Sequence, residues 1–177
     1  MARIIFIYGL VAGLIIIAGI IGTIVLAGDQ PHGNVWLGYL IMLLGMSAVF
    51  MGVKRYRDRE GGGVIRFLPA LGVGLAIALM ASVAYVLVWE IYLAATDYAF
   101  MDQYIATTLE ARRAEGLSGE AYRTLEASYR EMAVAYQSPL YRLPLTFVEI
   151  FPVGLLVSVV SAILLRNSRL LPARARA

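Results

Sequence analysis

Long apolar runs alternate with polar segments along this chain, and the apolar runs number four. They cover residues 4–27, 35–53, 67–96 and 143–165. A helix needs about 20 apolar residues to cross the hydrocarbon core of a bilayer, so each run is long enough to span it. Backbone groups in lipid are satisfied only in helices and closed barrels, and runs of this length favour helices. The pattern therefore predicts an all-α integral membrane four-helix bundle, with residues 1–177 forming a single membrane domain.

The longest polar segment, residues 97–140, is predicted to insert a helical hairpin between the third and fourth spans. Its larger apolar side chains recur at spacings of three and four residues, which is typical of a helical stripe. They are Met101, Ile105 and Leu109, followed by Tyr122, Leu125, Tyr129, Met132 and Tyr136. Gly116 is expected to stop the first helix, Ser118 to cap the second and Pro139 to end it. The second stripe could pack within the hairpin, rest on the bilayer or bind a partner, and internal packing is favoured.

Composition supports the membrane assignment and narrows the chemistry. Of the 177 residues 60% are hydrophobic and 15% are charged, against about 25% charged in soluble domains. Mean hydropathy is +0.76. The chain has no cysteine, which excludes disulfides, thiolate metal sites and cysteine nucleophiles, and His32 alone makes no histidine zinc site. We therefore expect no cofactor and no metal.

The distribution of charge predicts the orientation. If both termini are cytoplasmic, the inner side holds ten basic residues (Arg3, Lys54, Arg55, Arg57, Arg59, Arg66, Arg166, Arg169, Arg174 and Arg176). The outer side then holds five (Arg112, Arg113, Arg123, Arg130 and Arg142) beside eight acids. An excess of basic residues in short cytoplasmic loops is the ordinary pattern, so this orientation is favoured. The lipid bilayer is the expected partner of these basic clusters, and nucleic acid is not expected.

Two loops join the spans on either side of the second run. Residues 28–34 are rich in helix breakers and predict a tight outer turn. Residues 54–63 predict an inner loop that is charged and then flexible. Its charged side chains could contact lipid headgroups or anchor the loop, and anchoring is favoured. They are Lys54, Arg55, Arg57, Asp58 and Arg59.

Small residues repeat at every fourth position in three of the spans. In lipid the hydrophobic effect does not drive helices together, so their association depends on close van der Waals contact between backbones, which small residues allow. The predicted packing positions are Gly9 and Gly13, Gly74 and Ala78, and Gly154 and Ser158. Such ridges could also form a homo-oligomer interface, but packing inside one bundle is the more economical interpretation.

Two acidic residues, Glu90 and Glu149, lie inside the spans, where a charge is expensive and indicates function by default. Each is seven residues from the nearest outer charge, which corresponds to about 10 Å along a helix. Glu90 follows Trp89 and could be interfacial. Pro152 frees a carbonyl one turn earlier, beside Glu149, and that pair of groups could bind a proton or cation. Alternatively, Glu149 is protonated or pairs with Arg142 and only fixes helix register.

Four stretches taken in order resemble the bacterial membrane family known as domain of unknown function 4199. They are LGYLIMLLGMSAVFMGVKRYRD (37–58), GGGVIRFLPALGVGL (61–75), VLVWEIY (86–92) and TFVEIFPVGLLVSVVSAILL (146–165). The resemblance covers nearly the whole chain and implies a four-span protein of the bacterial inner membrane, but no activity. It places seven residues in its motifs: Tyr56, Arg57, Asp58, Trp89, Glu90, Glu149 and Pro152.

Three functional classes are left open by these patterns. A non-enzymatic structural, accessory or assembly protein is favoured, with a partner bound by the hairpin or by a glycine ridge. The first alternative is a small cation- or proton-coupled transporter that uses Glu149 and Glu90. The second is a lipid-acting enzyme, although the serines of the spans have no histidine partner for a hydrolase triad.

Overall fold

Residues 1–27 and 35–173 are described by the computed structural model, and within them the chain forms six helices. These are α1 (Ala2–Ala27), α2 (Val35–Glu60), α3 (Phe67–Ala95), α4 (Phe100–Ala114), α5 (Gly119–Tyr136) and α6 (Pro139–Leu165). The turn predicted at residues 28–34, with His32, lies outside the described residues. The predicted all-α fold is confirmed, with four long apolar helices and a shorter pair between the third and fourth of them.

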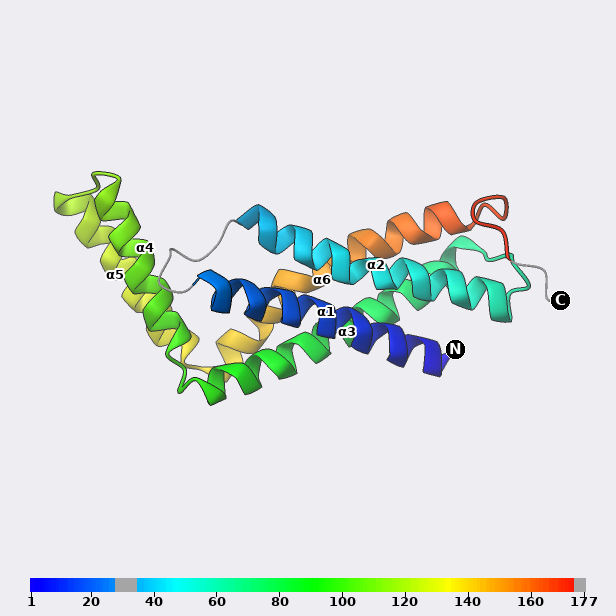
Figure 1. Cartoon of the computed structure of the whole chain (residues 1–177), viewed down its shortest axis with the longest axis horizontal. Coiled ribbons are helices and arrows are strands. Elements are labelled where there is room, and N and C mark those ends of the chain that lie inside the picture. The colour runs from blue at the N-terminus through cyan, green and yellow to red at the C-terminus, as the bar shows by residue number, and fades with distance from the viewer. Residues whose placement is uncertain (28–34, 174–177) are drawn as a thin grey trace.

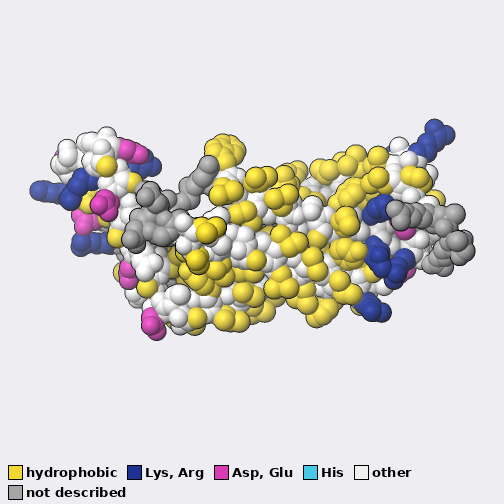
Figure 2. All heavy atoms as spheres, in the orientation of Figure 1, with side chains coloured by type: hydrophobic (Ala, Val, Ile, Leu, Met, Phe, Trp, Pro, Cys, Tyr) yellow, Lys and Arg dark blue, Asp and Glu magenta, His cyan; other side chains and the backbone are white. Residues whose placement is uncertain are grey.

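The four long helices, α1, α2, α3 and α6, run side by side, and α4 and α5 lie across one end of them (Figure 1). Each long helix is long and apolar enough to cross a membrane. Figure 2 shows hydrophobic side chains covering the middle of the molecule, with charged side chains gathered towards both ends. We call the end that carries α4 and α5 the hairpin end, and the opposite end, with the α2–α3 connection, the loop end.

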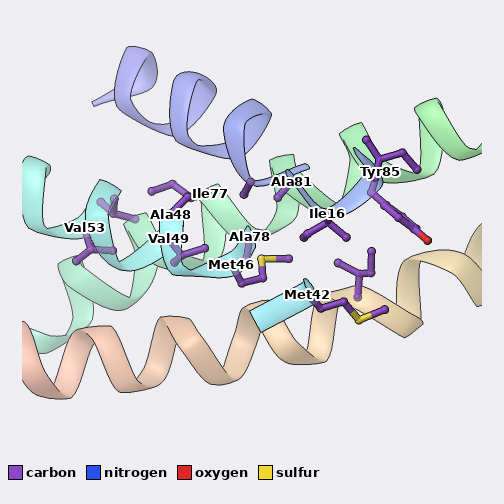
Figure 3. Close-up of a cluster of buried hydrophobic side chains, with 14 of the residues drawn as sticks. Ile16, Met42, Met46, Ala48, Val49, Val53, Ile77, Ala78, Ala81 and Tyr85 are labelled. Carbon is purple, nitrogen blue, oxygen red and sulfur yellow. The ribbon is translucent and has the colours of Figure 1, made fainter. Parts of the chain in front are cut away.

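The bundle is arranged so that α1 and α6 each pack against both α2 and α3. The apolar core runs along its centre, where Ile16, Met46, Val49 and Ile77 are fully buried (Figure 3). Small residues allow these helices to approach closely. A Cβ atom built on Gly9 would lie 2.5 Å from Met80 Cγ of α3, so no larger side chain fits there without rearrangement. Gly13 faces α3 in the same way, one turn further on.

The contact between α3 and α6 also depends on small residues. A Cβ atom on Gly74 would lie 2.9 Å from Ser158 Cβ, and one on Gly154 would lie 2.7 Å from Ala78 Cβ. The same Gly154 position meets Met46 of α2 at 3.2 Å, so three helices converge on it. The six residues proposed as packing positions therefore lie at helix contacts within one chain.

Two boundaries differ from those expected from the sequence. The segment from Lys54 to Glu60 forms the last turns of α2, so the predicted inner loop is wrong for its charged part and holds for residues 61–63. Helix α6 begins at Pro139, four residues before the expected fourth span, because proline is well suited to the first turn of a helix. Gly116 follows α4 with a φ of +95°, as expected of a helix stop, whereas Ser118 makes no capping side-chain hydrogen bond.

The α4–α5 hairpin packs through its apolar stripes. Ile105 and Leu109 of α4 are buried, and the stripe of α5 is half-buried while the rest of that helix is largely exposed. Arg113 of α4 lies over the Tyr122 ring of α5, 4.8 Å from its centroid. The α5 stripe therefore lies largely within the protein, and its last member, Tyr136, reaches α3.

Candidate functional site

Arg142, near the start of α6, is buried at the hairpin end and binds Glu90 of α3 through two of its three guanidinium nitrogens. Its Nε donates to Glu90 Oε1 at 2.6 Å and its Nη2 donates to Oε2 at 2.7 Å. Only 2% of Arg142 is exposed. A paired fork of this kind is the strongest geometry between arginine and a carboxylate, and it supplies the counter-charge that a buried cation requires.

The remaining arm of Arg142 is used by the end of α5. Its Nη1 donates to the carbonyl oxygens of Tyr136 at 2.8 Å and Gln137 at 3.3 Å. The rings of Tyr98 and Tyr136 flank the guanidinium group, with centroids 5.0 and 5.6 Å away. We call Glu90, Tyr136, Gln137 and Arg142 the Arg142 clamp. It joins α3, α5 and α6 at one buried point and fixes the base of the hairpin to the membrane helices.

Trp89 strengthens the same junction. Its indole Nε1 donates to the Tyr136 hydroxyl at 3.0 Å, and its ring packs edge-on against Phe100 with centroids 5.0 Å apart. Burial raises the pKa of the Tyr136 phenol. The phenol therefore stays protonated at neutral pH, and its oxygen accepts the indole hydrogen bond as a neutral group.

Glu149 is not part of the Arg142 clamp. It lies on the same side of α6 as Arg142, because seven residues make about two helical turns. Its side chain is exposed, and it forms no hydrogen bond or ion pair with the rest of the described chain. Its carboxylate interacts electrostatically with the phenols of Tyr85 and Tyr136. Arg142 is paired with Glu90, so the alternative in which Arg142 neutralises Glu149 is wrong.

Pro152 lies inside α6, as does Pro144. Proline has no amide hydrogen, so the carbonyl of Val148 lacks its usual donor four residues later. This free carbonyl is adjacent in sequence to Glu149. The polar site predicted around Glu149 and Pro152 therefore still has two available groups, the Glu149 carboxyl group and the carbonyl freed by Pro152. Glu90 is not available to it, because Glu90 is paired with Arg142.

A groove of about 300 Å³ lies between the hairpin-end halves of α3 and α6. Its lining is wholly apolar: Val83, Val86, Leu87, Leu143, Pro144, Phe147 and Val148. Glu149 is not part of this lining, and neither is Glu90. A transporter that uses both carboxylates would need a water-accessible cavity between them, and this groove does not provide one.

The loop end contains a second buried arginine. Arg57 is fully buried and donates from Nε to Asp58 Oδ1 at 2.8 Å, from Nη1 to the Leu170 carbonyl at 2.9 Å and from Nη2 to the Leu171 carbonyl at 2.5 Å. Lys54 also binds Asp58. Arg57, paired with Asp58, anchors the segment that follows α6. Of the five side chains proposed to contact headgroups, Arg55 and Arg59 are the exposed ones.

Several of these partners were not apparent from the sequence. In the sequence, Tyr85 resembles an ordinary interface aromatic residue, and Tyr136 looks like one more apolar position of the hairpin stripe. The Leu170 and Leu171 carbonyls are backbone groups, so no side-chain pattern identifies them as partners of Arg57. No group of three or more histidine, cysteine, aspartate or glutamate side chains able to hold a metal occurs among residues 1–27 and 35–173.

Residues 7–167 match the family model described as "Protein of unknown function (DUF4199)". No curated protein and no solved structure matches the chain. The match begins within α1, covers α2 to α6 completely and includes both buried arginines.

Proposed function

The chain belongs to the DUF4199 family, and we propose that it is a non-enzymatic accessory or assembly protein of the bacterial inner membrane. In this proposal the membrane bundle holds the α4–α5 hairpin as a fixed arm outside the bilayer, where it contacts a protein partner. The observation that carries the proposal is the Arg142 clamp, in which a buried charged side chain joins the end of α5 to α3 and α6. A hairpin without a role in contact would not need so rigid a base.

The proposed orientation has both termini in the cytoplasm and the hairpin in the periplasm. The loop end carries Lys54, Arg55, Arg57, Arg59 and Arg66 within a short stretch, whereas acids outnumber bases in the hairpin segment. This charge difference supports the orientation, since basic residues in short loops are retained on the cytoplasmic side.

A cysteine accessibility experiment tests the orientation, and the absence of native cysteine makes each label unique. Ser118→Cys, between α4 and α5, is expected to react with a membrane-impermeant maleimide in intact spheroplasts. Val64→Cys, exposed in the α2–α3 connection, is expected to react only after lysis. The reverse pattern would show that the hairpin is cytoplasmic.

Photocrosslinking in native membranes tests the partner proposal. A photoreactive amino acid at Ala127, on the exposed side of α5, is expected to give a discrete protein adduct. The matched position is Leu156, which is 61% exposed on α6 within the span and should react with lipid alone. Recovery of monomer alone from both positions contradicts the proposal.

Two variants test whether formation of the Ala127 adduct depends on the Arg142 clamp. Arg142→Gln is expected to reduce the Ala127 adduct, because the hairpin loses its attachment to Glu90 and to the end of α5. Arg55→Gln removes an exposed arginine at the loop end, away from the hairpin, and should leave the adduct unchanged. Adduct yields are compared at equal amounts of folded membrane protein.

The second candidate function is a small proton- or cation-coupled transporter, and the exposed, unpaired Glu149 favours it. Ionisable residues within spans commonly mark ion pathways. Glu90 is bound by Arg142, so a transport role would depend on Glu149 without the second carboxylate.

A further inference from the structure

Glu149 presents a carboxyl group at membrane depth, and no cation balances it among residues 1–27 and 35–173. It lies ten residues into α6, between the polar Arg142 and the apolar half of the span. The charged residues of α2 all lie at its loop end, and α1 carries only Arg3, also at the loop end. An unpaired carboxylate in hydrocarbon is costly, whereas the neutral acid is far less so, which favours a bound proton.

The hydroxyl group of Tyr85 on α3 is buried and has no hydrogen-bond partner among the described residues. Only 3% of this residue is exposed. Buried hydroxyl groups nearly always have a partner, so an unused one indicates a missing contact. Figure 3 shows the Tyr85 ring at the edge of the apolar cluster, with its hydroxyl pointing away from the aliphatic side chains. Its electrostatic neighbours are the Glu149 carboxylate on α6 and the Tyr136 phenol on α5, and the phenol oxygen already accepts a hydrogen bond from Trp89.

The other titratable groups around Glu149 are accounted for. Tyr136 of α5 accepts a hydrogen bond from Trp89, and Glu90 of α3 is paired with Arg142 on Glu149's own helix. Tyr39 on the hairpin-end half of α2 and Tyr141 on α6 are about half exposed. None of these groups brings a positive charge to Glu149. Within the part of the chain that the structure describes, Tyr85 is the remaining donor considered for the ionised carboxylate.

We propose that Glu149 and Tyr85 form a reversible proton-binding site within the membrane span. Glu149 holds the proton on its carboxyl group, and the Tyr85 hydroxyl donates a hydrogen bond to the carboxylate when that proton leaves. Glu149 is exposed on the outer side of α6, so the site is open to a reagent that partitions into the bilayer. This site is independent of the proposed partner-binding role, because it uses no residue of the hairpin.

A hydrophobic carbodiimide tests the site in purified full-length protein in liposomes. The reagent modifies a protonated carboxyl group: the acid proton moves to one carbodiimide nitrogen, and the carboxylate oxygen bonds to the central carbon as a carbon–nitrogen π bond opens. In apolar surroundings the adduct rearranges to a stable N-acylurea. Trypsin then releases residues 143–166, in which Glu149 is the only acid, so mass spectrometry assigns the modification without ambiguity.

At pH 7.5 we expect modification of Glu149 and none of Glu90, because both carboxyl oxygens of Glu90 are bound by Arg142. A glutamate in water, with a reference pKa near 4.3, is protonated in fewer than about one molecule in a thousand at this pH, so hairpin glutamates serve as internal controls. Glu149→Gln should abolish the modification of this peptide. Modification of Glu149 no greater than that of Glu115, an exposed hairpin acid, would overturn the proposal.

The contribution of Tyr85 is tested by the pH at which modification of Glu149 falls by half. Tyr85→Phe removes the donor to the ionised form and is expected to move this pH upward. Tyr141→Phe, which removes an exposed hydroxyl from α6, is the matched control and should leave it unchanged. An unchanged half-point in Tyr85→Phe overturns the role of Tyr85. Protection from modification by Na⁺ at constant pH and ionic strength overturns the assignment of the ligand as a proton.

Discussion

Glu90→Gln is expected to lower the free energy of unfolding by about 3–5 kcal/mol, the usual effect of removing one partner of a buried ion pair. The substitution keeps the size of the side chain but leaves the Arg142 guanidinium group without a counter-charge where only 2% of that residue is exposed. Equilibrium unfolding by dodecyl sulfate in mixed micelles measures the change. In a Trp36→Phe background, the fluorescence of Trp89, next to Glu90 and hydrogen-bonded to Tyr136, reports on the junction.

A double-mutant cycle separates the pair from its surroundings. Adding Arg142→Gln to Glu90→Gln removes the uncompensated charge, so the double variant should be less destabilised than the sum of the single variants by about 2 kcal/mol or more. Glu126→Gln, which breaks the exposed pair with Arg130 on α5, is the control and should change stability by less than about 1 kcal/mol. Additivity within about 0.5 kcal/mol would mean that Glu90 and Arg142 do not interact in the membrane.

The spans were predictable because their signal is local and strong. A run of about 20 apolar residues has few structural solutions in lipid, and small residues at every fourth position mark where helices touch. Gly154 and Ala78 illustrate this, since their spacing indicated a packing ridge and the structure places them against each other. The end of α2 was not predictable in the same way. Hydropathy falls sharply at Lys54, although the helix continues to Glu60 with Lys54 and Asp58 paired one turn apart.

The pairing of the intramembrane charges depends on how each helix is rotated about its own axis in the bundle. That rotation is set by contacts between helices and cannot be predicted from the local sequence. Glu90 and Glu149 are both seven residues from an outer charge, so the sequence places them at one depth without distinguishing them. Arg142 and Glu149 share a side of α6, which made a pair between them plausible. The packing of α6 on α3 instead directs the guanidinium group to Glu90 and leaves Glu149 with Tyr85 as its phenolic neighbour on α3.

Arg57→Leu is expected to destabilise the loop end by about 3 kcal/mol and to release the segment that follows α6. Arg57 makes three hydrogen bonds from a fully buried position, two of them to the Leu170 and Leu171 carbonyls, and hydrogen bonds to charged groups contribute about 1.5–3 kcal/mol each. Limited trypsin digestion detects the release, because Arg166 and Arg169 lie in or beside this segment. Cleavage after Arg169 should be several-fold faster in the variant than in the wild type.

Two further variants distinguish anchoring from a general loss of positive charge. Arg55→Leu removes an exposed arginine from the same turn of α2 and should leave both stability and the rate of cleavage after Arg169 unchanged. Arg57→Lys keeps the charge, but one ammonium group cannot span Asp58 and two separate carbonyls, so it should behave like Arg57→Leu. Full recovery in Arg57→Lys would show that charge alone holds this end, as contact with anionic headgroups requires, and that the buried guanidinium geometry is not what anchors it.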